Sequence, residues 1–195
     1  MTYAELARRV RAEIGQQHRY EHSVRVARCA ELLAQRHNVD TQQARLAGIL
    51  HDLARLYSGP RLIAECEARG ISVDSFERNH PLVLHAKVSA AIASERFGVG
   101  DAQVLSAISK HTTAAAAMSR LDCVVYLADS LEPLRRFPER ATLWNLATHD
   151  LTTGMRETLV VSFGHLRAKG FPIAPQTLAA AAAFGAEVRT REGVS

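Results

Sequence analysis

Hydrophobic positions recur along the chain at the spacing of α-helices. Apolar residues fall three or four positions apart over most of the 195 residues, which places them on one face of a helix. Segments that alternate apolar and polar residues, as half-buried strands do, are nearly absent. The pattern predicts helices over roughly 3–15, 20–37, 41–56, 60–69, 82–97, 101–111, 119–132, 140–148, 152–169 and 175–189. We therefore expect an all-α helical bundle.

Glycine and proline separate the predicted helices. Gly59-Pro60, Pro81, Gly98 and Pro133 all lie at expected boundaries, where these residues start or end helices. No repeat, low-complexity linker or shift in composition divides the chain, so a single domain is the simplest organisation. We place this domain at residues 1–185 and a C-terminal tail at residues 186–195.

The composition is that of a soluble globular protein with an excess of basic groups. Hydrophobic residues make up 47% and charged residues 23%, with a net charge of +4 at pH 7. A positive charge favours an anionic partner such as a phosphorylated metabolite, a nucleotide or nucleic acid, although a generally basic surface has the same signature. The three cysteines form no CxxC pattern, which is typical of reduced thiols. With no secretory signal or long apolar segment, we expect a cytoplasmic protein that does not bind membranes.

Six polar residues interrupt the apolar faces of five predicted helices: His22, His51, Asp52, His85, His111 and Asp129. A buried imidazole or carboxylate without a partner costs about 1–3 kcal/mol or more. One such histidine is most often a satisfied core residue, but a recurring arrangement is best explained by convergence on a common partner. Imidazole nitrogen and carboxylate oxygen together suit divalent iron, manganese, cobalt or zinc. A helical bundle can hold such an ion between its helices.

The remaining motifs carry less information. His18, His37, His80, His149 and His165 do not fit the pattern, and we expect them at the surface or in structural roles. The chain has no GxxxxGK[ST] segment, so an ATP-driven activity has little support. It also lacks a helix-turn-helix signature and a clustered Lys/Arg face, so we expect no nucleic-acid partner.

The order of the six polar residues resembles that of the HD-domain metal-dependent phosphohydrolases. Longer segments are more specific: "RYEHSVRVA", "AGILHDLAR", "HPLVLHAKV" and "KHTTAAAAMSRLDCVVYLADSLEP" resemble, in order, the bacterial YqeK-type family of symmetrical diadenosine tetraphosphate hydrolases. The similarity runs from about residue 3 to residue 180. It implies an HD-domain helical bundle and a metal-dependent enzyme that cleaves its dinucleotide substrate into two molecules of ADP.

The resemblance also implies roles for individual residues. The positions that match ligands of an iron-type metal are His22, His51, Asp52 and Asp129. Asp52 is in addition a candidate catalytic base, although a role as ligand alone is equally open. His85 and His111 match positions that face the phosphates and can hold a second metal. The matching phosphate-contacting positions are Arg19, Arg55, Thr112 and Arg135. The matching loop beside the nucleotide base consists of Gly170, Phe171, Pro172, Ile173, Ala174 and Pro175.

Departures from the family pattern keep other functions open. Relatives commonly have Gly-Arg-Pro-Gly where this chain has Ala114 to Ala117, a change that favours helix over flexible loop. Arg55 stands where lysine is usual, and Ser130 where tyrosine is usual. The alternatives are a different HD-type nucleotide phosphohydrolase and a non-catalytic nucleotide-binding protein. We expect a dinucleoside polyphosphate or another nucleotide as ligand, and a homodimer remains open.

Overall fold

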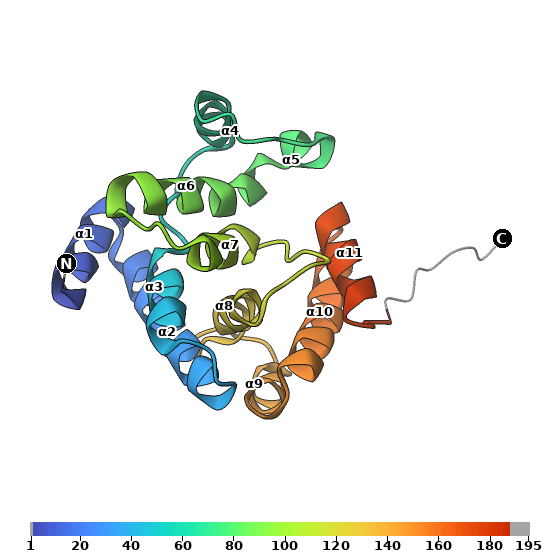
Figure 1. Ribbon diagram of the computed structural model, residues 1–195. Coiled ribbons are helices and arrows are strands. Elements are labelled where there is room, and N and C mark those ends of the chain that lie inside the picture. Colours follow the sequence, from blue (N-terminus) through green and yellow to red (C-terminus); the bar gives the residue numbers. More distant parts are fainter. Residues whose placement is uncertain (1, 188–195) are drawn as a thin grey trace.

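The computed structural model describes residues 2–187 (Figure 1). Helices form over most of the segments in which the sequence carries an apolar stripe. The elements of this range are α1 (Tyr3–Ile14), α2 (Gln17–Arg36), α3 (Thr41–Leu50), α4 (Gly59–Ala68), α5 (Ser75–Asn79), the 3-10 helix η1 (Pro81–Leu84), α6 (His85–Phe97), α7 (Ala102–Lys110), α8 (Arg120–Leu131), α9 (Arg140–His149), α10 (Leu151–Ala168) and α11 (Pro175–Ala183). No strand occurs among these residues, which confirms the prediction of an all-α bundle. None of the described helices combines the length and the apolar character needed to span a bilayer.

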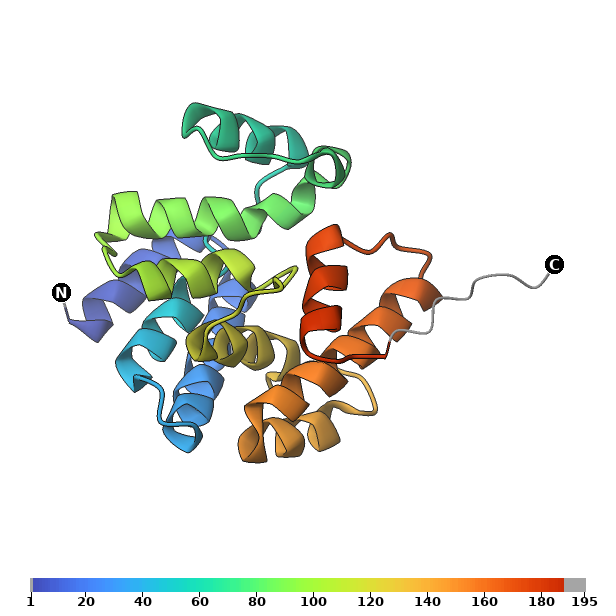
Figure 2. The ribbon, with the colours of Figure 1, turned by 45° about the vertical axis from the view of Figure 1, so that its right-hand side comes forward.

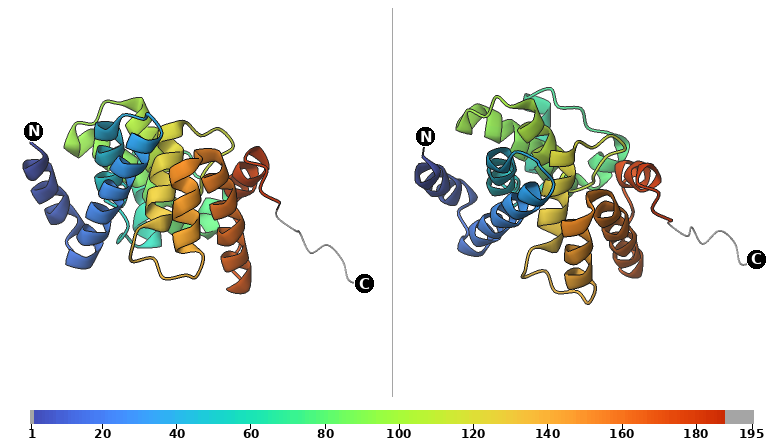
Figure 3. Two further views of the ribbon diagram at one scale, coloured as in Figure 1. Left: turned by 90° about the horizontal axis from the view of Figure 1, so that it is seen from below. Right: turned by 60° about the horizontal axis from the view of Figure 1, so that its bottom comes forward.

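The central element is α8, whose sequence is apolar almost all the way round. Its residues from Leu121 to Ala128 are all buried, as expected of a helix inside a bundle. It packs against α2, α3 and α7 on one side and against α9 and α10 on the other (Figures 1 and 3). Asp129, near its C-terminal end, directly follows this buried segment and is itself partly buried.

Small residues bring α2 and α3 into close contact. A Cβ atom added to Gly48 would lie 2.7 Å from the Cα atom of Ala27, so only glycine allows this spacing. Ala27, Ala30 and Ala44 are fully buried in the same core. The close approach sets the distance between the helices that carry His22 and His51.

The prediction of one continuous helix over residues 41–56 is wrong. Helix α3 ends at Leu50, and residues 51–56 form turns. The amides of Arg55 and Tyr57 donate to carbonyls three residues earlier, at 3.0 Å each, while the amide of Ala54 donates to the Ser89 hydroxyl of α6. Because that hydroxyl replaces a helical carbonyl, the chain turns immediately after His51.

Other boundaries also differ from the predicted ones. The segment 82–97 divides into η1 and α6, and the short helix α5 had no counterpart in the prediction. The last helix ends at Ala183 rather than 189, ahead of Gly185 at φ +65°. Of the predicted tail, residues 188–195 lie outside the described part of the chain, and the domain boundary at 185 stays a prediction.

The segment from Ala114 to Ala117 is not helical, despite its helix-favouring composition. Ala114 has φ +56°, in the left-handed region that disfavours residues with a Cβ atom. The Lys110 ammonium donates to the Ala117 carbonyl at 2.9 Å and to the buried Asp122 carboxylate at 2.8 Å. These contacts hold the segment as a loop between α7 and α8 (Figure 2).

Candidate metal centre

The ends of several helices bring the six predicted polar residues together. His22 lies on α2, His51 and Asp52 directly follow α3, and Asp129 lies on α8. His85 begins α6 and His111 directly follows α7. The ring centroids of His22 and His51 lie 5.3 Å apart, those of His51 and His111 4.7 Å, and those of His85 and His111 5.0 Å. Residues separated by more than 100 positions in the chain thus form one buried cluster.

All four histidines of the cluster use Nδ1 for a contact that points away from it. His51, His85 and His111 each donate Nδ1–H to the backbone carbonyl three residues earlier, at 2.6–2.7 Å. His22 Nδ1 lies 3.2 Å from the Glu132 carboxylate. Because carbonyl and carboxylate oxygens only accept, the Nδ1 atoms carry the protons. In the neutral rings, the Nε2 lone pairs therefore face the centre of the cluster.

Asp52 lies between two pairs of these histidines. Its Oδ2 atom is 3.6 Å from His51 Nε2 and 3.8 Å from His22 Nε2. Its Oδ1 atom is 3.3 Å from His85 Nε2 and 3.7 Å from His111 Nε2. Each oxygen of one carboxylate thus faces a different pair of imidazoles, so Asp52 would be available as a ligand on either side.

Burial and charge set the protonation of the cluster. Burial lowers the pKa of His51, and it lowers that of His111 to about 3, so both rings are neutral near pH 7. Burial alone would raise the pKa of Asp52, but the neighbouring His51 and His85 hold it below its usual value. The pKa of Asp129 is also held below its usual value, against the effect of burial, with the Arg135 guanidinium as the neighbouring cation. The cluster therefore combines neutral imidazoles at His51 and His111 with ionised carboxylates at Asp52 and Asp129.

The donor atoms fit a transition metal. Among residues 2–187, the Nε2 atoms of His22 and His51 are buried without a hydrogen-bond partner. They lie 3.0 and 3.7 Å from Asp129 Oδ1, so acceptor lone pairs face one another. A buried acceptor left in this position is costly unless a cation accepts its lone pair. Two groups of three, His22–His51–Asp129 and His51–Asp52–His111, each have their ligand atoms within 4.8 Å of one another.

The predicted phosphate-contacting residues surround this cluster. Arg19 Nη1 lies 3.8 Å from Asp52 Oδ2. Arg135 donates from its guanidinium to the Asp129 carboxylate, and its Nε atom donates to the Asp129 carbonyl at 2.9 Å. The Thr112 hydroxyl lies 3.1 Å from His85 Nε2 and 3.0 Å from His111 Nε2. All three side chains and that of Arg55 line the same cavity.

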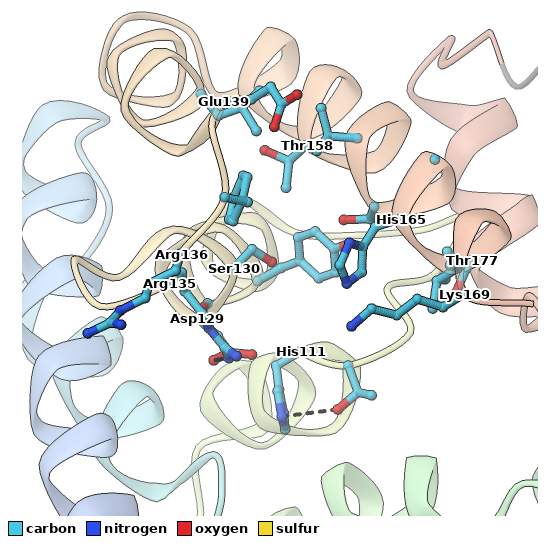
Figure 4. A pocket seen from close by; sticks show the side chains of 18 of the residues that line it. His111, Asp129, Ser130, Arg135, Arg136, Glu139, Thr158, His165, Lys169 and Thr177 are labelled. Atoms are coloured by element: carbon cyan, nitrogen blue, oxygen red, sulfur yellow. Dashed lines mark hydrogen bonds and ion pairs between the residues drawn. The ribbon is translucent and has the colours of Figure 1, made fainter. Parts of the chain in front are cut away.

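This cavity has a volume of about 980 Å³ and extends from the cluster between α8, α9 and α10. Asp129, Arg135 and His111 lie at one end of it (Figure 4). Glu139 and Thr158 lie across from them, and the hydroxyl of Thr158 is buried without a partner in the described residues. A cavity of this size accommodates an organic ligand as large as a nucleotide.

The predicted base loop does not reach the cavity wall. None of the residues from Gly170 to Pro175 lines the cavity, and the Phe171 side chain is 56% exposed. The flanking residues Lys169 and Thr177 do line it (Figure 4). In this structure the six loop residues therefore do not contribute to the cavity beside the histidine–aspartate cluster.

Sequence reasoning missed several residues of this site. His165, which we expected at the surface or in a structural role, is exposed but faces the cavity with Lys169 (Figure 4). Their spacing of four residues along the chain was the available signal. Glu132 has no local pattern that indicates its contact with His22, 110 residues away.

The comparisons with known proteins agree with this geometry. The HD domain family matches residues 19–134, a range that contains all six clustered residues, and the chain belongs to this family. It is 35% identical over 163 residues to a protein of Halalkalibacterium halodurans named symmetrical bis(5'-nucleosyl)-tetraphosphatase, covering 84% of this chain and 87% of that protein. A Bacillus subtilis (strain 168) protein of the same name is 32% identical over 161 residues, with 83% and 86% covered.

A solved structure shows the same fold. The crystal structure of a predicted HD superfamily hydrolase involved in NAD metabolism, from Clostridium acetobutylicum, superposes with a TM-score of 0.90. It is 29% identical in sequence, and the match covers 96% of this chain and 99% of that one. The helical bundle described above is therefore an HD-domain fold.

Proposed function

We propose that this chain is a metal-dependent hydrolase that splits diadenosine tetraphosphate symmetrically into two molecules of ADP. Two relatives named for this activity are 32% and 35% identical to the chain over more than four fifths of its length. The single observation that carries the proposal is the buried cluster of histidines and aspartates at one end of a large cavity. The cluster provides ligands for a metal, and the cavity provides room for a nucleotide.

We assign four residues as metal ligands, with iron as the first candidate ion: His22, His51, Asp52 and Asp129. When bound, a transition metal supplies Lewis-acid chemistry toward phosphoryl oxygens and water. His85 and His111 would hold a second ion or contact phosphate, a role supported by their position on the other side of Asp52. Both oxygens of Asp52 face ring nitrogens, which favours a role as ligand over that of a catalytic base.

Three arginines and a threonine would bind the polyphosphate. Arg19, Arg55 and Arg135 place cationic groups on the cavity wall beside the cluster, and charge-assisted hydrogen bonds from guanidinium groups suit phosphate oxygens. The Thr112 hydroxyl adds a small donor beside His85 and His111. Contact between the loop at 170–175 and the nucleotide base stays part of the proposal, with Lys169 and Thr177 as the nearest cavity-lining residues.

A second candidate is a hydrolase of the same family that acts on a different nucleotide. The Clostridium acetobutylicum protein is named as a predicted hydrolase involved in NAD metabolism, and the loop at Ala114–Ala117 departs from the family pattern. This loop closely follows Thr112, and the Thr177 hydroxyl of α11 donates a hydrogen bond to the adjoining Thr113 carbonyl, 2.8 Å long. The loop therefore lies next to the cavity, and a change in its sequence would affect which substrate the cavity accepts.

Product analysis distinguishes these candidates. Protein loaded with Fe²⁺ or Mn²⁺ is incubated with diadenosine tetraphosphate, diadenosine triphosphate, NAD⁺, ATP and nucleoside monophosphates, with Asp52→Ala as the inactive control. The proposal predicts ADP as the sole product of diadenosine tetraphosphate. Equal amounts of AMP and ATP would indicate asymmetric cleavage and contradict it, while preferential cleavage of another nucleotide would support the second candidate.

The proposal also includes a cytosolic location. Cys29, Cys66 and Cys123 are free thiols, and all three are buried. Free thiols are typical of proteins that function in a reducing compartment. The proposed reaction involves neither a nucleic acid nor a membrane.

A further inference from the structure

His22 differs from the other three histidines of the cluster in the partner of its Nδ1 atom. His51, His85 and His111 donate to a backbone carbonyl of their own chain segment, three residues earlier. His22 instead meets the carboxylate of Glu132, which follows α8 and lies 110 residues further along the chain. Of the four rings, only that of His22 therefore has a negatively charged group as the partner of its Nδ1 atom.

The Glu132 carboxylate is itself fixed by several donors. It is 3% exposed and lies directly after α8, which carries Asp129. Its Oε2 atom accepts a hydrogen bond from Arg25 Nε at 2.8 Å and another from the Leu134 amide at 2.9 Å. Arg25 Nη2 also reaches its Oε1 atom at 3.4 Å. A buried carboxylate with this many donors has a single orientation, which it passes on to the His22 ring.

A carboxylate behind a histidine ligand has a known physical effect. It fixes the tautomer and the ring orientation and makes the Nε2 lone pair a stronger donor to a metal, usually by 10- to 100-fold in affinity. We propose that Glu132 is a positioning residue that makes the group of His22, His51 and Asp129 the tighter metal subsite, and the group containing His111 the weaker one. This inference rests on the metal centre of the proposed function and is independent of its substrate.

The same carboxylate connects the metal subsite to Arg135. By accepting from the Leu134 amide, Glu132 fixes the turn that follows α8. Arg135, the next residue, then lies over Asp129 and donates to its carbonyl and carboxylate. One buried side chain thus holds both a metal ligand and the arginine beside the ion, so we expect its loss to weaken the binding of metal and of polyphosphate together.

The test is a metal titration that does not depend on hydrolysis. Mn²⁺ is titrated by calorimetry into chelator-treated wild-type protein and the Glu132→Gln variant, which keeps the size of the side chain but loses its charge. We expect the tightest binding event to weaken by about 10- to 100-fold and the weaker event to stay unchanged. Binding of inorganic tripolyphosphate to the metal-loaded protein should weaken as well.

Glu77→Gln is the matched control. Glu77 is 5% exposed and, like Glu132, accepts from a cation, Lys87, and from a backbone amide, that of Asp74. Both variants should lower the melting temperature, but only Glu132→Gln should change metal affinity. Equal Mn²⁺ affinity in Glu132→Gln and wild type, or equal losses in both variants, would overturn the inference.

A second measurement requires no variant. Imidazole ¹⁵N NMR of Zn²⁺-loaded wild-type protein should show His22 with a protonated Nδ1 and a metal-bound Nε2. Coordination through Nδ1, or an Nδ1 without a proton, would overturn the inference even if Glu132→Gln did not fold. Failure to cleave diadenosine tetraphosphate would contradict the proposed function but leave these results intact.

Discussion

Replacement of Arg135 by alanine tests the proposed phosphate-binding side of the site. The Arg135 guanidinium lines the cavity and donates to Asp129 through two groups, one to the carboxylate and one to the carbonyl. Its side chain is 41% exposed, so a bound polyphosphate can reach the donors that Asp129 leaves free. Arg135→Ala removes all of these donors at once.

The size of the effect differs between catalysis and stability. Loss of one charge-assisted contact costs about 1.5–3 kcal/mol, which lowers kcat/KM by about 10- to 100-fold. An ion pair this exposed contributes at most about 1 kcal/mol to stability, so the melting temperature should fall by no more than about 2–4 °C. Arg135→Lys keeps the charge but not the planar fork, so its activity should lie between those of wild type and Arg135→Ala.

The assay measures kcat/KM for diadenosine tetraphosphate at saturating Mn²⁺, together with metal content and melting temperature. Arg61→Ala, on α4 and outside the cavity lining, controls for the general loss of a positive charge. An unchanged kcat/KM in Arg135→Ala would show that Arg135 does not bind the substrate and is a surface residue. Loss of the metal would instead give it a structural role.

Three further predictions concern stability. Ala114→Gly should raise the free energy of unfolding by about 1–2 kcal/mol, because glycine accepts the left-handed backbone at this position. An unchanged denaturation midpoint would show that the backbone of Ala114 is not strained. Gly48→Ala should lower the free energy of unfolding by about 1–3 kcal/mol, because the added Cβ atom would meet the backbone of Ala27. Denaturant unfolding of the variant and of wild type measures this loss. For His111, whose pKa falls from 6.5 to about 3 on folding, the unfolded state binds more protons between these values, so stability falls as the pH drops from 6.5 toward 3. In metal-free protein His111→Gln should flatten this fall between about pH 7 and pH 4.5, and an equally steep fall would argue against the shift.

The sequence was sufficient to predict the helical fold and the clustered polar residues. Apolar stripes at helical spacing define the bundle, and polar side chains on those stripes, such as His51 and Asp52, indicated that they would gather around a common partner. The end of α3 was not predictable, because it depends on a hydrogen bond between the Ala54 amide and the hydroxyl of Ser89. That contact joins segments 35 residues apart, and no local pattern signals it.

The residues that surround the site were predicted less completely for the same reason. Arg135 was identified through the family resemblance, but its contact with Asp129 became visible only in three dimensions. His165 and Lys169 line the cavity because α10 packs against α8, and the sequence does not specify that packing. Long-range contacts thus determine which exposed polar residues face the site.

The central claim is that the buried cluster around His51 and Asp52 is a metal centre. The most direct test is elemental analysis of protein purified without chelator, in parallel with an Asp52→Ala variant whose folding is verified by circular dichroism. We expect a substantial fraction of at least one transition-metal ion per wild-type chain and loss of that metal in Asp52→Ala. Metal-free wild-type protein that retains full hydrolytic activity would contradict it.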